Sequence, residues 1–241
     1  MLLEDRNAVI YGAGGSIGRA AAVAFAREGA NVQLAGRTRS RLEEVAAGVR
    51  RAGGAAEVAE LDALDERAVD EHADTVAARA GSIDISLNVI SHGELFGTPL
   101  AASSVADFER PVHTAVRSNF LTARAAARHM TRQRSGVILM FGGYGAPQSD
   151  FHLGGFQVGL TAVDALRRQL AAELGPHGIR VLTIQSTGVS HEPANQIAGR
   201  TLLGRAATFE DVGNAAAFAA SDHAGAMTAT ALNITCGEEV D

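Results

Sequence analysis

Short apolar runs of strand length alternate with longer stretches of helical period along nearly the whole chain. Seven such runs are candidate strands, at residues 7–11, 31–35, 56–60, 85–89, 136–141, 180–185 and 232–234. The helical stretches between them begin near Gly18, Arg39, Glu66, Asp107, Phe156 and Glu210. Strand, helix and strand in this order form the unit of parallel sheets that helices cover on both faces. The sequence therefore predicts one α/β domain over residues 1–241, a Rossmann-type doubly wound, mostly parallel sheet of seven strands.

Composition excludes several classes of partner. The chain has 241 residues, 46% of them hydrophobic, which suits one large core. Its net charge of −6 offers no positive field, so we expect neither nucleic acid nor an anionic membrane surface as a partner. No apolar run approaches the roughly 18 residues of a membrane-spanning helix. The first residues do not resemble a signal segment and Cys236 is the single cysteine, so we expect a cytoplasmic location.

A glycine-rich turn follows the first predicted strand. Its residues are Gly12, Ala13, Gly14, Gly15, Ser16, Ile17 and Gly18, and a helical stretch comes next. Glycines in such a turn let backbone N–H groups approach a pyrophosphate, and the helix amino terminus adds a favourable dipole. The turn predicts a dinucleotide site, although a strand-to-helix turn without a ligand is the alternative.

The end of the second predicted strand favours a phosphorylated cofactor. Binders of the unphosphorylated dinucleotide usually place a carboxylate here, on the ribose hydroxyls. This chain has Gly36 and Arg37 instead, with Arg39 and Arg41 close by. A guanidinium binds a 2′-phosphate well, so NADP(H) is the expected cofactor. The alternative is a solvated arginine cluster at the start of a helix.

Several separate segments resemble the short-chain dehydrogenase/reductase family, from about Arg6 to Gly237. The glycine-rich turn, the Asp62-Ala63 pair and the sequence 83–88 come in the family's order. The helix-to-strand join at 171–181 and the tail at 203–233 match as well. The resemblance implies that Asp62 and Ala63 contact the adenine, and that Asn88 and Gly188 belong to the cofactor site.

The family's catalytic set is Tyr, Lys, Ser and Asn, and none of the four is present at the matching positions. Alignment from Glu173 puts the Tyr position at Phe156 and the Lys position at Leu160. The Ser position falls at Gly143 and the Asn position at Ala115, with Asn119 one helical turn later. The chain contains no lysine, because all 21 of its basic Lys/Arg residues are arginine. The family's ordinary proton transfer is therefore not possible here.

Other residues are candidates for acid–base chemistry. Tyr144 follows the Ser position, and His152 lies four residues before the Tyr position, so we prefer this pair as catalytic residues, with Asp150 able to orient either one. Three more histidines are expected at the rim of the cleft, namely His92, His113 and His191. No spacing of His, Asp and Glu resembles a metal site, so no metal is expected.

Three functions remain open from the sequence. The first is an NADP(H)-dependent oxidoreductase that acts on a small hydrophobic molecule by a non-standard mechanism. The second is an enzyme of the same fold that catalyses a cyclisation, dehydration or isomerisation. The third is a non-catalytic subunit that senses the cofactor or pairs with another protein. The family resemblance implies a homodimer or homotetramer paired through helices near 107–133 and 156–174, where alanine-rich faces permit close packing.

Overall fold

All seven strands form one parallel sheet in the order β3-β2-β1-β4-β5-β6-β7. The computed structural model describes residues 1–93, 95–143, 151–192 and 197–240. The strands are β1 Asn7–Tyr11, β2 Asn31–Gly36, β3 Ala55–Glu60, β4 Ile85–Asn88, β5 Gly136–Gly142, β6 Ile179–Gln185 and β7 Ala231–Asn233. Strands β1, β4 and most of β5 are buried, as expected for strands covered on both faces. The predicted seven-stranded α/β fold is confirmed.

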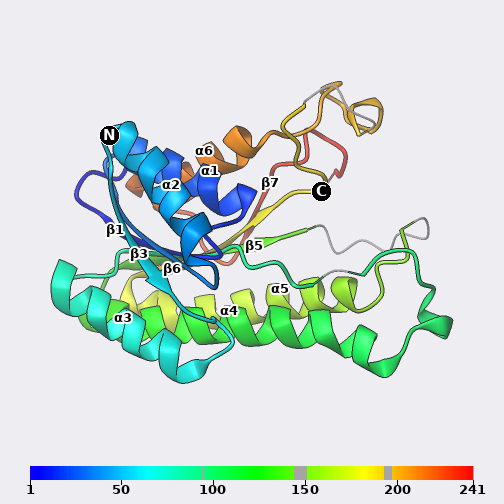
Figure 1. The fold of residues 1–241 in the computed structure, drawn as a ribbon, viewed down its shortest axis with the longest axis horizontal. Helices are drawn as coiled ribbons and strands as arrows, with labels where there is room; N and C mark the ends of the chain where they lie inside the picture. The colour runs from blue at the N-terminus through cyan, green and yellow to red at the C-terminus, as the bar shows by residue number, and fades with distance from the viewer. Residues whose placement is uncertain (94, 144–150, 193–196, 241) are drawn as a thin grey trace.

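Helices cover both faces of the sheet (Figure 1). The α-helices are α1 Ser16–Arg27, α2 Arg39–Arg51, α3 Glu66–Ala80, α4 Val105–Gln133, α5 Gly155–Leu174 and α6 Phe209–Ala220. Short 3-10 turns lie at Leu100–Ala102, Gly175–His177, Ala198–Arg200 and Asp222–Ala224. Helices α1, α2 and α6 form one layer, and α3, α4 and α5 form the other. No helix within the described ranges is long and apolar enough to cross a membrane.

Helices α4 and α5 pack closely because α5 carries glycines at the crossing. A Cβ atom added at Gly155 would lie 2.0 Å from the carbonyl oxygen of Phe108, and one at Gly159 would lie 3.2 Å from Cβ of Ala115. The alanine-rich faces expected to pair with a second subunit are Ala123–Ala127 and Ala171–Ala172. Of these alanines, Ala123, Ala125, Ala126, Ala127 and Ala171 lie in the core of this subunit, and Ala172 is exposed. Pairing of subunits through α4 and α5 stays a prediction.

The glycine at the helix crossing can be tested by a pair of alanine substitutions. Gly155→Ala forces backbone against backbone, and we expect it to lower the free energy of unfolding by about 1–3 kcal/mol. Gly48→Ala, inside α2, meets nothing within 4 Å. We expect that control to raise stability by about 0.5–1 kcal/mol, because glycine is a poor helix former. Chemical denaturation of both variants checks this, and equal stabilities would contradict the packing described.

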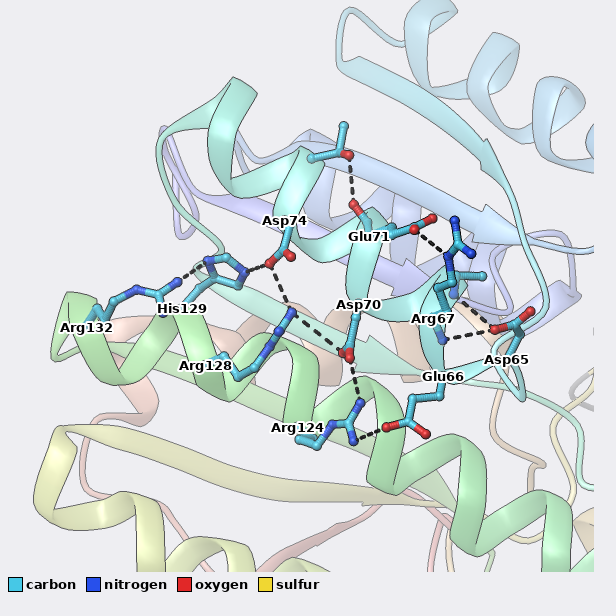
Figure 2. A network of polar contacts seen from close by, with 12 residues as sticks. Asp65, Glu66, Arg67, Asp70, Glu71, Asp74, Arg124, Arg128, His129 and Arg132 are labelled. Carbon is cyan, nitrogen blue, oxygen red and sulfur yellow. Dashed lines mark hydrogen bonds and ion pairs between the residues drawn. The ribbon is translucent and has the colours of Figure 1, made fainter.

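Ion pairs join α3 to α4 along one side of the molecule (Figure 2). Arg124 contacts Glu66 at 2.6 Å and Asp70 at 2.7 Å, and Arg128 contacts Asp74 at 3.0 Å. His129 extends the network, because its Nε2 lies 2.8 Å from the same Asp74 carboxylate. Each exposed pair contributes little alone, so the effect depends on the connected set. The network keeps α3, and the loop before it, in a fixed position against α4.

The start of α6 is held by a reciprocal cap. Thr208 Oγ1 accepts from the backbone N–H of Asp211, and the Asp211 carboxylate accepts from the backbone N–H of Thr208. The guanidinium of Arg205 also donates to Asp211 at 2.6 Å. This hydrogen bond, together with those from Thr208, lowers the pKa of Asp211 from 3.8 to about 2.

Acid titration tests this cap. The depressed pKa of Asp211 means that its ionised form stabilises the fold above about pH 4, and that this contribution is lost as the pH falls from about 4 to 2. Asp211→Asn should cost about 1 kcal/mol at neutral pH, the usual effect of losing a helix cap. The difference from the wild type should shrink below pH 4 in urea unfolding curves. A constant difference down to pH 2 would contradict the assignment.

Candidate functional site

Two adjoining cavities lie at the carboxyl ends of the strands. The first has a volume of about 420 Å³ and the second about 320 Å³. Both are lined by residues that the two cavities share, namely Gly15, Val89, Ile90, Ser91 and His92. They form one groove across the ends of β1 and β4, where the order of strands along the sheet reverses. In an open α/β sheet this is the position at which ligands bind.

Glycines of the turn after β1 have two different roles. Gly12 has φ +87°, and a Cβ atom there would lie 2.8 Å from the carbonyl oxygen of Val89. A Cβ at Gly18 would lie 2.6 Å from the carbonyl oxygen of Gly12, so both glycines permit close packing of the protein itself. Gly14 and Gly15 line the first cavity; a Cβ at Gly14 would lie 3.2 Å from Cβ of Arg41, whereas one at Gly15 would come no nearer than 3.5 Å to another described atom. The start of α1 is therefore open to a ligand.

Three arginines line the first cavity, and one of them, Arg110, contacts Asp107 at 2.9 Å. Arg37 follows β2 and Arg41 lies in the first turn of α2. Both are exposed, and neither forms an ion pair with another described residue. Arg39 is not part of the lining, and its guanidinium contacts Glu43 at 3.4 Å instead. Of the three arginines named from the sequence, the structure brings Arg37 and Arg41 together in the groove.

The Asp62-Ala63 pair also lines the first cavity. The Asp62 side chain accepts a hydrogen bond from the backbone N–H of Leu64 at 3.0 Å. Arg117 of α4 donates to the carbonyl oxygen of Leu64 at 2.8 Å. Helix α4 therefore fixes the loop that forms this wall.

Asn88 and Gly188 are not part of the lining of the groove. Asn88 is buried, donates to Thr122 Oγ1 at 3.0 Å, and accepts from the backbone N–H of Ile90 at 3.0 Å. It thereby positions the segment 89–91, which lines both cavities. A Cβ at Gly188 would lie 1.9 Å from Cδ1 of Ile197, so this glycine permits close packing of the segment after β6.

Ser16, Ile17 and Gly18 of α1 line part of the second cavity. Three positions that the family resemblance singled out meet in another part, namely Gly143, Phe156 and Leu160. A Cβ at Gly143 would lie 3.2 Å from Cδ1 of Leu160 and 3.9 Å from Cζ of Phe156. Phe141 and Phe209 complete a largely apolar lining.

The fourth position does not reach this cavity. Ala115 is fully buried between helices, where it faces Gly159. Asn119, one turn later, is also buried, and its Nδ2 donates to the carbonyl oxygen of Ala115 at 2.9 Å. The Asn119 amide therefore binds its own helix and does not line the groove.

The acid–base candidates are placed very differently. Tyr144 and Asp150 lie outside the described residues. His152 is exposed, with φ +48°, and is not among the residues that line either cavity. His113 and His191 are exposed as well, although His191 packs on the Phe209 ring with centroids 4.5 Å apart.

His92 is the histidine that the structure places inside the groove. It is 4% exposed, and its ring centroid lies 5.8 Å from that of Phe156. The sequence did not distinguish it from the other rim histidines, because burial is not visible in a loop. The sequence signal for its place in the groove was that it directly follows the segment 89–91 at the end of β4.

The chain's other tyrosine, Tyr11, is not a candidate for proton transfer. Tyr11 is fully buried at the end of β1, and burial raises the pKa of its phenol, with a further rise from the charge of Asp70. Its neighbour His72, which meets the Tyr11 ring edge-on, has its pKa lowered by burial to about 4. Both side chains are therefore neutral at pH 7. No three His, Cys, Asp or Glu side chains of the described residues are grouped as metal ligands.

The parallel sheet, the glycine-rich turn and the groove at the strand reversal are the features of the α/β fold on which dehydrogenases are built. The family model described as enoyl-(acyl carrier protein) reductase matches residues 12–238. The chain belongs to the short-chain dehydrogenase/reductase family.

Related proteins and solved structures cover nearly the whole chain. The 7alpha-hydroxysteroid dehydrogenase of Clostridium sardiniense is 28% identical over 94% of this chain and 90% of its own length. Cyclopentanol dehydrogenase of Comamonas sp. (strain NCIMB 9872) is 28% identical over 98% of this chain and 97% of its own length. A solved 7 alpha-hydroxysteroid dehydrogenase complexed with NADH and 7-oxo glycochenodeoxycholic acid has a TM-score of 0.89 at 26% identity, over 99% of this chain and 97% of that one.

Proposed function

We propose that this protein is an NADP(H)-dependent oxidoreductase that interconverts a small hydrophobic ketone and its secondary alcohol. The observation that carries the proposal is the polarity of the groove along its length. Arg37 and Arg41 lie at one end, open glycines lie in the middle, and an apolar cavity lies at the other end. A nicotinamide dinucleotide has the same order of groups, with a charged phosphate end and a flat ring that transfers hydride.

The chain's own residues fit such a cofactor. Gly14 and Gly15 leave the start of α1 accessible, so backbone N–H groups and the helix dipole can bind the pyrophosphate. Asp62 and Ala63 form the wall for the adenine end. The related structure named above contains NADH. In this chain, Gly36 and the two guanidiniums at the end of β2 favour an added 2′-phosphate, because arginine binds phosphate oxygens in a bidentate manner.

The substrate class follows from the second cavity and from the relatives. Phe141, Phe156, Leu160 and Phe209 give this cavity an apolar wall, against which an apolar substrate ring beside the nicotinamide could pack. The related dehydrogenases are named for a hydroxysteroid and for cyclopentanol, both of which carry an alcohol on an alicyclic ring. An alicyclic ketone or secondary alcohol is therefore the substrate class that we propose.

Arginine substitutions test the cofactor assignment. Arg37→Ala removes a guanidinium that would contact the 2′-phosphate, so we expect its affinity for NADPH to fall roughly tenfold or more, the effect of losing a charge-assisted hydrogen bond. Affinity for NADH should change little. Arg39→Ala is the matched control, because Arg39 is paired with Glu43 outside the groove. Calorimetric titration of the three proteins with NADPH and NADH measures both affinities.

The same titration can contradict the proposal in two ways. Equal losses for NADPH and NADH on Arg37→Ala would show that the arginine does not read the 2′-phosphate. Absence of binding to the wild type at millimolar NADPH and NADH would exclude a redox cofactor altogether. Gly15→Val adds a check on location, because its side chain would project into both cavities and should abolish binding. Because Gly15 is the N-cap of α1, we expect Gly15→Val to lower the free energy of unfolding by only about 1 kcal/mol, the effect of a poor helix cap.

The replacement of the Tyr, Lys and Ser positions by Phe156, Leu160 and Gly143 favours a second candidate, an enzyme of this fold that performs non-redox chemistry. A cofactor-sensing subunit without catalysis is the third. Oxidation of NADPH in the presence of an alicyclic ketone, followed by the loss of the absorbance of reduced nicotinamide, separates the first function from the other two.

A further inference from the structure

We propose that His92 is the acid–base catalyst of this site and replaces the missing tyrosine. This inference rests on the proposed function. In ketone reduction the His92 imidazolium gives its proton to the carbonyl oxygen, and in alcohol oxidation the neutral imidazole removes the hydroxyl proton.

The position of His92 carries the argument. Its ring packs against Phe156, the residue at the family's Tyr position, with centroids 5.8 Å apart. His92 lines both cavities, as do Gly15 and the segment 89–91. A cofactor with its phosphates on Gly14 and Gly15 and its ring in the second cavity would therefore pass beside His92. In that arrangement the imidazole would lie beside the nicotinamide ring and beside a substrate bound against it.

His92 is also the suitable chemical group among the cavity side chains. Within the described lining of the second cavity, the other polar side chains are the hydroxyls of Ser16 and Ser91. A serine hydroxyl holds its proton too tightly to act as an acid or base at neutral pH, whereas an imidazole ordinarily titrates between pH 5 and 8. The remaining lining is aliphatic or aromatic, so the imidazole is the described side chain of this cavity that is suited to transfer a proton.

When bound, NADPH would supply the hydride for the new C–H bond at the carbonyl carbon as the C=O π bond breaks, and would leave as NADP⁺. The N–H bond of the imidazolium breaks as the oxygen takes its proton, so the ketone becomes the alcohol. The neutral imidazole then takes a proton from solvent before the next turnover.

Substitution of His92 by glutamine tests this role. We expect His92→Gln to lower the turnover of cyclopentanone or 7-oxo glycochenodeoxycholic acid with NADPH by roughly 10²–10⁴-fold, the usual effect of removing a positioned acid. Its NADPH affinity, measured by calorimetry, should stay near that of the wild type. His223→Gln is the control with the same chemical change, because His223 is exposed in the turn Asp222–Ala224, outside both cavities. It should retain full turnover.

Two further readouts separate catalysis from packing. His92→Ala should regain part of its turnover when free imidazole is added, which a purely structural role would not produce. The ring proton resonance of His92, identified by its absence in His92→Gln, should shift when the wild type is saturated with NADPH. That second readout requires no substrate.

Each adverse outcome has a distinct meaning. Unchanged turnover in His92→Gln, or a His92 resonance that NADPH does not move, overturns the role of His92 and leaves the proposed function standing. Loss of turnover in Tyr144→Phe or His152→Ala, with His92→Gln unaffected, assigns the proton transfer to those residues instead. Failure of the wild type to bind NADPH or NADH overturns the proposed function itself, and the role of His92 in hydride transfer with it.

Discussion

The reversal of strand order between β1 and β4 is the constraint on which the site depends. After β3 the chain crosses to the other side of β1, so the segments that follow β1 and β4 leave neighbouring strands in opposite directions. The space between them is the groove, and its floor is set by the contact of Gly12 with the carbonyl group of Val89. A side chain at Gly12 would force these two segments apart. The same local geometry thus determines the depth of the groove and its opening to a ligand.

Helix α4 holds both walls of this groove in place. Through Arg117 it fixes the loop at Leu64, and through Thr122 it fixes Asn88 and the segment beyond it. Further along, Arg124 and Arg128 bind the acidic face of α3. Its small residues also admit α5, which carries Phe156 and Leu160 into the second cavity. One long helix therefore connects the nucleotide end of the groove with its apolar end.

The apolar end has a definite chemical consequence. Gly143, Phe156 and Leu160 meet without any group that can transfer a proton. Hydride transfer to a ketone leaves charge on the oxygen, and an aliphatic surface does not stabilise that charge. If this cavity catalyses ketone reduction, the proton must come from a residue outside the family's usual set. His92, which is buried in the lining of this cavity, is such a residue.

The sequence by itself determined the order of strands and helices, the glycine-rich turn and the apolar character of the catalytic positions. These features depend on local periodicity and on spacing along the chain, so the strands fell within a residue or two of their predicted bounds. The tertiary structure decided that Arg41 and not Arg39 faces the groove, because that depends on the rotation of α2 about its axis. It also placed His92 inside and left His152 exposed. Both histidines belong to loops, and a loop has no periodicity that tells which side chain will be buried when distant segments pack together.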